Sequence, residues 1–297
     1  MIRSTNRELG EFDLIRKPEH VAKVWAEIES RLPKYWESTL GSMAPFHFIG
    51  AIDDYNSEAE KYRELFSAEA MDEFHDDPNS FKQTLMHDVP VTARTLRQKR
   101  AELKEWQMHF RRSSPNDLLT VFANVMDFQE TWREAHPPAE YAGYDALEEF
   151  ELDPLDDDET MRILKVVGMG IKSIILHHLD AGRFPARSRY GLYGLFFLTG
   201  HNTFGLPSDS SEFVMINDED PTSSGSLIMD QNYWYPYGLF SLYALRISRW
   251  LEPHINAGGV KFDANLRFVF VERFFKLICD EHNDDLKTMR DYERFDV

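Results

Sequence analysis

The segment 201–235 contains the side chains whose types best suit catalysis or ligand binding. Histidine and carboxylate side chains transfer protons and bind hard cations, and aromatic side chains close by can form the walls of a pocket. We therefore predict a candidate pocket in this segment. It consists of His201, Asp209, Glu212, Asp230, Trp234 and Tyr235. The alternative is that the polar residues form turns and the aromatic side chains attach the loop to the core.

Two histidine motifs occur outside this segment. His87-Asp88 resembles the His-Asp core of the HD-type metal phosphohydrolases, which are also helical, over residues 85–89. The resemblance implies a metal shell completed by a second His upstream and a distant Asp. Pro90 departs from the pattern, so we interpret the pair as surface residues near a helix end. We interpret His177-His178 as structural, because the helix macrodipole favours His at a C-terminus.

Negative charge is concentrated in one part of the chain. Residues 140–159 include ten Asp or Glu and no Lys or Arg, in a chain whose net charge is −18. Clustered like charge speeds association with partners of opposite sign, although it also simply keeps a protein in solution. We therefore predict a surface that binds a basic protein partner. Its contact residues are Glu148, Glu149, Glu151, Asp153, Asp156, Asp157 and Asp158.

Two functions from different classes follow from these patterns. The favoured one is an acidic binding or inhibitory protein, for example an immunity protein or antitoxin that neutralises a basic partner. The alternative is a metal-dependent hydrolase on a helical scaffold, with its site in the 201–230 region or at His87 and Asp88. The chain has no P-loop, GxGxxG, GxSxG or CxxC motif. We therefore predict no cofactor and assign no metal site, and whether the protein is an enzyme stays open.

Charge and hydropathy argue against nucleic-acid and membrane partners. The net charge opposes binding to phosphate backbones, and the basic stretch 94–112 is interrupted by Glu102 and Glu105, as in a solvated helix face. The longest apolar runs fall short of the roughly 20 residues that span a bilayer. Residues 1–10 are polar, and Cys279 is the single cysteine, which favours a cytoplasmic location. The oligomeric state is not indicated.

Hydrophobic spacing predicts a mainly α-helical, multi-helix globular bundle. Pro18 opens one helix, and Ser57 with Glu60 forms a capping box for another. Ser114-Pro115 starts a third helix, which the prolines after His136 end. A long apolar stretch at 156–182 is expected to be the central buried helix. The other expected helices cover 81–87, 91–110, 187–199, 236–251 and 263–281.

One long irregular segment interrupts the helical pattern at 201–235. Residues 212–216 and 226–229 are expected to pair as a short β-hairpin, joined by a turn at 218–225. Connections of this length are uncommon in compact domains unless they have a function. We expect one helical domain over 1–297 with this insertion, and the alternative is a division into 1–136 and 156–297.

Overall fold

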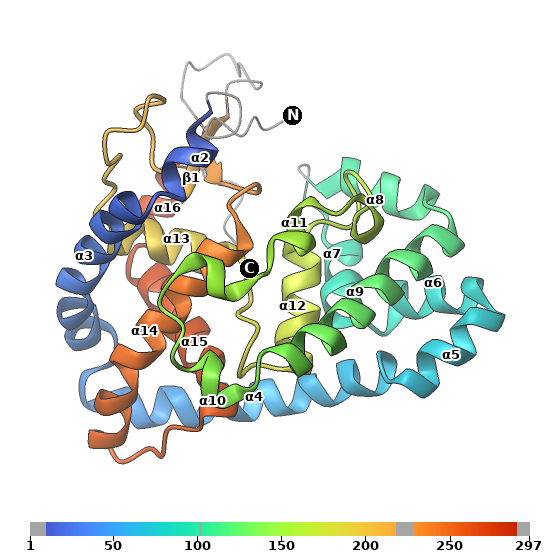
Figure 1. The fold of residues 1–297 in the computed structure, drawn as a ribbon, viewed down its shortest axis with the longest axis horizontal. Coiled ribbons are helices and arrows are strands. Elements are labelled where there is room, and N and C mark those ends of the chain that lie inside the picture. The colour runs from blue at the N-terminus through green and yellow to red at the C-terminus, as the bar shows by residue number, and fades with distance from the viewer. Residues whose placement is uncertain (1–9, 101–102, 218–227, 290–297) are drawn as a thin grey trace.

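Helices make up most of the computed structural model, which describes residues 10–100, 103–217 and 228–289 (Figure 1). The predicted fold class is confirmed: these residues form a mainly α-helical bundle with one antiparallel β-hairpin. The elements are α2 (Glu11–Ile15), α3 (Pro18–Tyr35), α4 (Ala44–Leu65), α5 (Ala68–Asp76), α6 (Pro78–His87), α7 (Pro90–Arg97), α8 (Lys104–Arg112), α9 (Pro115–Ala135), α10 (Pro138–Tyr141), α11 (Asp153–Asp157), α12 (Met169–Leu179), α13 (Arg189–Leu198), β1 (Val214–Asn217), β2 (Ile228–Gln231), α14 (Tyr237–Ala257), α15 (Arg267–Glu281) and α16 (Asn283–Met289). None of the helices described is long and apolar enough to cross a membrane.

Helix starts follow the capping signals in several places. The Ser114 side chain accepts a hydrogen bond from the Asp117 N–H, and Pro115 occupies the first turn of α9, as predicted. Ser188 caps α13 in the same way, through the N–H of Gly191. The helices predicted at 187–199, 236–251 and 263–281 are confirmed as α13, α14 and α15, with small differences at their ends.

The central buried helix begins later than the sequence pattern predicts. The expected helix at 156–182 is wrong in its first part, because α12 starts only at Met169. The Asp158 carboxylate accepts the N–H of Thr160 and caps a short 3₁₀ turn instead. Ile163 and Val167 then form an isolated antiparallel bridge. Apolar residues in this part are therefore buried by a turn and not by a helix.

Two other predicted boundaries are also wrong. Ser57 does not cap a helix but lies inside α4, where its hydroxyl donates to the Asp54 carbonyl. The single helix expected at 91–110 is divided into α7 and α8, and Gln98 leaves helical geometry with a ψ of 136°. Local signals of this kind mark a helix start only where the preceding residues do not already continue a helix.

The long segment folds in part as predicted. β1 pairs with β2 in antiparallel fashion, with Val214 opposite Gln231 and Met215 opposite Asp230. The observed strands lie about two residues later than the predicted ones. The predicted turn at 218–225 falls outside the residues that the structure describes.

Helix α12 lies in the middle of the molecule, between two groups of helices (Figure 1). One group contains α3, α13, α14 and α15, and the other contains α5 to α9. Two main hydrophobic clusters fill the interior. Both clusters include residues of α4, α9 and α12. Phe48 of α4 and Leu176 of α12 belong to the first cluster, whereas Tyr62 of α4 and Ile175 of α12 belong to the second. These three helices therefore link the two groups.

Close packing of α13 on α15 predicts how the fold responds to a single methyl group. A Cβ atom added at Gly194 in α13 would lie 2.4 Å from Cδ1 of Phe275 and 3.0 Å from its Cβ. We predict that Gly194→Ala lowers the free energy of unfolding by about 1–3 kcal/mol, the cost typical of overpacking a core. Urea denaturation measures this value.

Gly50 provides the matched control, because it lies in α4 with nothing within 4 Å of an added Cβ. Gly50→Ala should stabilise the protein by roughly 0.5–1 kcal/mol through helix propensity alone. Equal stability changes at the two positions would contradict the packing of α13 on α15.

Candidate functional site

A cleft of about 960 Å³ opens between six helices: α4, α7, α8, α12, α13 and α15. The turn after α7 and the segment that follows β2 complete its walls. A cavity of this size accommodates a small organic ligand. Its charged wall residues are Arg94, Arg100, Arg187, Arg189, Arg273, Lys276, Asp54, Glu58 and Glu272.

The charge of this cleft is opposite to the charge of the whole chain. Six Arg or Lys residues line it against three Asp or Glu residues, although the chain has a net charge of −18. Within the described ranges, Arg189, Arg273 and Lys276 have no carboxylate partner in an ion pair. Among the described residues, no carboxylate oxygen lies within 4.0 Å of these three cations.

Arg189 lies where a cation is unfavourable unless an anion comes close. It is the first residue of α13, so its charge is next to the positive end of the helix macrodipole. Its guanidinium lies 5.1 Å from the centre of the Tyr190 ring, and the Lys276 ammonium lies 5.9 Å from the same ring. Tyr190 thus brings two cations together at the N-terminus of α13, an arrangement that attracts anions.

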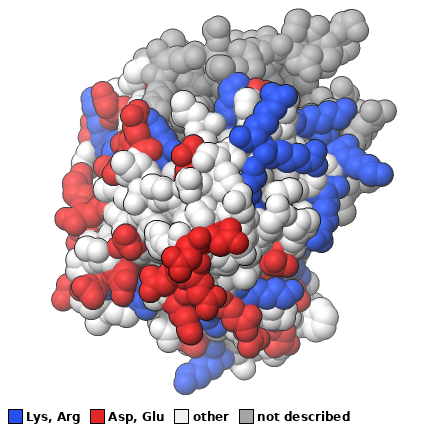
Figure 2. All heavy atoms as spheres, turned by 90° about the vertical axis from the view of Figure 1, so that its right-hand side faces the viewer, with Lys and Arg blue, Asp and Glu red and all other residues white. Residues whose placement is uncertain are grey.

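Exposed cations continue from the cleft onto α7 and α8. Figure 2 shows that basic and acidic side chains gather on separate parts of the face on that side of the molecule. The exposed basic residues of α7 and α8 are Arg94, Arg97, Lys104, Arg111 and Arg112. Arg94 itself pairs with Glu58 across the cleft wall.

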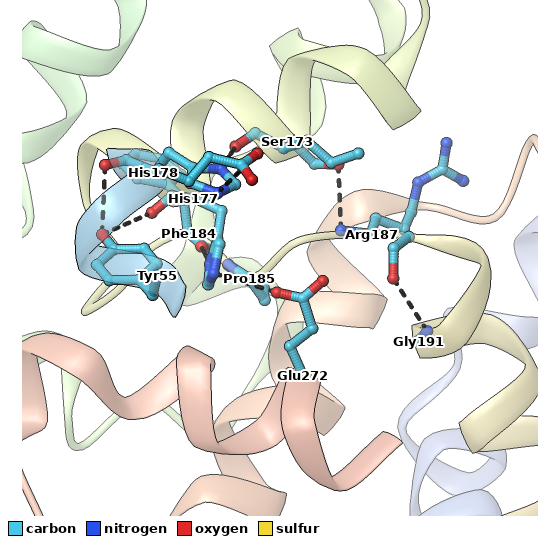
Figure 3. A network of polar contacts seen from close by, with 12 residues as sticks. Tyr55, Ser173, His177, His178, Phe184, Pro185, Arg187, Gly191 and Glu272 are labelled. Atoms are coloured by element: carbon cyan, nitrogen blue, oxygen red, sulfur yellow. Dashed lines mark hydrogen bonds and ion pairs between the residues drawn. The ribbon is translucent and has the colours of Figure 1, made fainter. Parts of the chain in front are cut away.

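Two adjacent histidines at the end of α12 face carboxylates from two other helices (Figure 3). The His177 Nε2 atom lies 3.3 Å from Oε2 of Glu272 in α15, and the His178 Nε2 atom lies 3.7 Å from Oε1 of Glu58 in α4. The Tyr55 hydroxyl is 3.2 Å and 3.3 Å from the carbonyl oxygens of His177 and His178, which fixes this helix end against α4.

Backbone carbonyls determine which nitrogen of each ring carries a proton. His177 Nδ1 lies 3.0 Å from the Phe184 carbonyl and His178 Nδ1 lies 2.7 Å from the Ile174 carbonyl. A carbonyl oxygen only accepts, so both Nδ1 atoms are donors. The Nε2 atoms are therefore acceptors in the neutral rings, and both point at carboxylates.

The pKa values of His177 and Glu272 are shifted in opposite directions. Burial lowers the pKa of His177 to about 4, and burial with the neighbouring His177 lowers the pKa of His178 to about 4. Burial also raises the pKa of Glu272. His177 is therefore neutral near pH 7, and its Nε2 atom is buried 3.3 Å from the Glu272 carboxyl without a hydrogen bond to any described residue. Such a pair can donate or accept a proton within the cleft.

Arg187 holds one wall of the cleft in place. Its guanidinium donates to the Tyr235 carbonyl at 2.9 Å and to the Tyr233 carbonyl at 3.0 Å, and its backbone N–H donates to the Ser173 hydroxyl at 3.1 Å. The side chain is 5 % exposed. Arg187 therefore ties the segment after β2 to α12.

The structure does not bring the six residues of the predicted pocket into this cleft. Glu212 and Tyr235 are buried, and the Tyr235 hydroxyl donates to Glu212 at 2.8 Å. Asp230 accepts hydrogen bonds from the hydroxyls of Tyr193 and Tyr233, each at 2.9 Å. These contacts attach the hairpin to the core, as in the alternative interpretation.

The other three residues of that predicted pocket are exposed. His201 stacks on Phe196 with ring centres 4.3 Å apart, and Asp209 adopts a left-handed conformation with a φ of 52°. Trp234 is 43 % exposed and lines a second, smaller cavity. The His87-Asp88 pair lies at the end of α6 and does not line either cavity.

The acidic segment is divided between surface and internal roles. Glu148, Glu151 and Asp157 are exposed. Asp156 instead accepts the Tyr237 N–H at 2.7 Å, and Asp158 accepts the Thr160 N–H at 2.7 Å. Three of the exposed contact residues are also bonded: Glu149 accepts backbone N–H groups, Asp153 pairs with Arg16, and Glu151 lies 3.6 Å from His136 Nε2.

Metal-ligand side chains are not clustered in the part of the chain that the structure describes. In that part, no group of three or more His, Cys, Asp or Glu side chains is arranged to hold a metal ion. Metal-dependent hydrolysis therefore stays a prediction from the sequence.

The burial of His177 predicts a specific dependence of stability on pH. Its folded pKa of about 4 lies below the ordinary value of 6.5, so the unfolded chain binds more protons between these values. The stability from a neutral His177 is complete above pH 6.5 and is lost as the pH falls towards 4. The raised pKa of Glu272 has the opposite effect on stability, because the stability that comes from its protonated carboxyl is lost as the pH rises.

His177→Asn isolates this effect, because asparagine retains a donor for the Phe184 carbonyl but does not titrate. Between pH 6 and 5, we predict that its unfolding free energy changes less steeply than that of the parent protein, by up to about 1.4 kcal/mol per pH unit. Urea denaturation at several pH values measures both slopes, and parallel slopes would contradict a neutral, buried His177.

Comparison with known proteins adds no further constraint. No protein-family model matches the chain, and neither a curated protein nor a solved structure matches it.

Proposed function

We propose that the protein binds a small anion, a molecule with a phosphate or carboxylate group, in the cleft between α4, α7, α8, α12, α13 and α15. One observation carries this proposal: a cleft of about 960 Å³ has a surplus of basic residues in a strongly acidic chain. A charged cleft with low-dielectric walls focuses the field and concentrates ligands of opposite sign.

The cations that would contact the anion are Arg189, Arg273 and Lys276. They lie on α13 and α15, which pack against each other, so the helices hold their side chains on neighbouring walls. Arg273 is further oriented by a contact of 2.9 Å between its guanidinium and His47 Nδ1. A guanidinium supplies several donors in a fixed plane, which suits phosphate and carboxylate oxygens.

The His177–Glu272 pair gives the cleft a group that can exchange a proton with a bound anion. Glu272 is close to these cations, since it precedes Arg273 and lies one turn before Lys276 on α15. Its raised pKa leaves the carboxyl protonated at higher pH than usual, which also reduces its repulsion of an anion. The cleft thus combines anion binding with a group capable of acid–base chemistry.

Neutralising two of these cations tests the proposal. Arg189→Ala combined with Lys276→Ala removes charges that have no ion-pair partner in the described residues, so no carboxylate is left unpaired. We predict that the variant binds pyrophosphate at least roughly tenfold more weakly, since one hydrogen bond to a charged group contributes about 1.5–3 kcal/mol. Isothermal titration calorimetry at low salt measures both affinities.

Lys104→Ala is the matched control, because Lys104 is an exposed cation of α8 that does not line the cleft. Its affinity for pyrophosphate should equal that of the parent protein. If the control and the double substitution weaken pyrophosphate binding equally, the attraction is non-specific. If the double substitution leaves the affinity unchanged, the anion binds elsewhere.

A second candidate function, docking of a basic protein, is favoured by the exposure of the acidic segment. Three of its exposed acids lie before residue 158: Glu148 is in the 3₁₀ helix Leu147–Phe150, Glu151 follows that helix, and Asp157 ends α11. Exposed charge of one sign accelerates association with a partner of the opposite sign. Asp156 and Asp158 are poor probes of this surface, because their carboxylates cap backbone N–H groups.

Glu148→Lys with Glu151→Lys tests this second function without altering those caps. A basic protein captured from the native lysate by the parent protein at low salt should be lost by this variant. The control reverses Asp72 and Glu73, two exposed acids of α5, and should still capture it. Capture of the same protein by all three forms would rule out docking at the acidic segment.

A further inference from the structure

A second cavity of about 180 Å³ lies beside the first turn of α12, and a lysine is in its wall. Lys172 is 2 % exposed and is the one buried lysine in the part of the chain that the structure describes. The cavity shares Gly168, Met169 and Tyr233 with the larger cleft. The two spaces are therefore adjacent, but Lys172 lines only the smaller one.

The Lys172 ammonium lacks the counter-ion that a buried cation usually has. Its Nζ atom donates a hydrogen bond to the Leu155 carbonyl. No Asp or Glu oxygen of the described chain lies within 4.0 Å of it. Buried lysines are rare unless they are paired, because an isolated ammonium loses its hydration energy. Burial consequently shifts the equilibrium of Lys172 towards the neutral amine.

The surrounding charges shift the pKa of this amine in both directions. Asp156 and Asp158 favour the ammonium, whereas Arg187 and Arg162 disfavour it. The position of Lys172 in the first turn of α12 also disfavours it, since this is the positive end of the helix macrodipole. Burial has the largest effect, and the pKa of Lys172 falls to about 8.

We propose that Lys172 is a nucleophilic amine that captures a small aldehyde or ketone in this cavity. The nitrogen lone pair attacks the carbonyl carbon to give a carbinolamine, and loss of one water molecule leaves an imine. The step needs neither an oxidant nor a reductant. Desolvated lysines in apolar pockets are activated for this chemistry in general.

The cavity also indicates the kind of carbonyl compound. Its walls are largely apolar, with Phe12, Ile163, Leu164, Met169 and Trp234 among them. The two other cations that line it are already paired, Arg162 with Glu159 at 3.1 Å and Lys165 with Glu105 at 2.6 Å. A cavity of roughly 150 Å³ holds a molecule the size of benzene. The expected ligand is therefore a short uncharged aldehyde or ketone.

Reductive alkylation tests this inference directly on the full chain. The protein is treated with sub-stoichiometric propanal and sodium cyanoborohydride at pH 7, and the modified lysines are mapped by peptide mass spectrometry. A pKa near 8 gives Lys172 more than about 100-fold more neutral amine than an ordinary lysine, so its labelling should exceed that of Lys165 by roughly tenfold or more.

Lys165 is the internal control, because it lines the same cavity but is exposed and paired. The preference should disappear when the protein is labelled in 8 M urea, where every lysine is equally solvated. Labelling of exposed lysines with Lys172 unmodified would overturn the inference. Pyrophosphate binding in the larger cleft is measured separately and does not depend on Lys172, so failure of one proposal leaves the other intact.

Discussion

Burial of α12 is the constraint on which the arrangement of this protein depends. The helix places Lys172, Ser173 and His177 in the interior, where a polar group must be bonded or lose its charge. His177 becomes neutral between the Phe184 carbonyl and Glu272, and Ser173 accepts the backbone N–H of the segment that leads into α13. The helices around α12 are thus positioned by the polar contacts that its burial requires, as well as by apolar packing.

The same burial explains why the groups with shifted pKa values lie on or beside this helix. Both cavities border its first turn, and the larger one extends to the histidines at its end. Desolvation lowers the pKa of each basic group on the helix, while the carboxyl group of Glu272 is shifted in the opposite direction. Groups with displaced pKa values in a cleft are characteristic of functional sites, although structural networks produce them as well.

The sequence predicted the class of fold and most helix positions, but not the cleft. Apolar runs and proline or serine residues at their starts identified α9 and α13 to α15, although α13 is buried on every face and not on one. The pattern failed at 163–167, where a bridged turn buries apolar residues as a helix would. The cleft brings together residues from six helices with no fixed spacing. Its signals were weak: His177-His178 at the end of an apolar run, and Arg189 just after the cap Ser188, where an acid is the usual residue.

The central claim is that the cleft binds an anion between α13 and α15, and anomalous scattering locates such an anion directly. Crystals would be grown with selenate, a tetrahedral dianion that mimics phosphate, and data would be collected at the selenium edge. The account predicts an anomalous peak within hydrogen-bond distance of Arg189, Arg273 and Lys276, beside the first turn of α13. Peaks confined to other basic surfaces, such as α8, or an empty cleft at saturating selenate would contradict it.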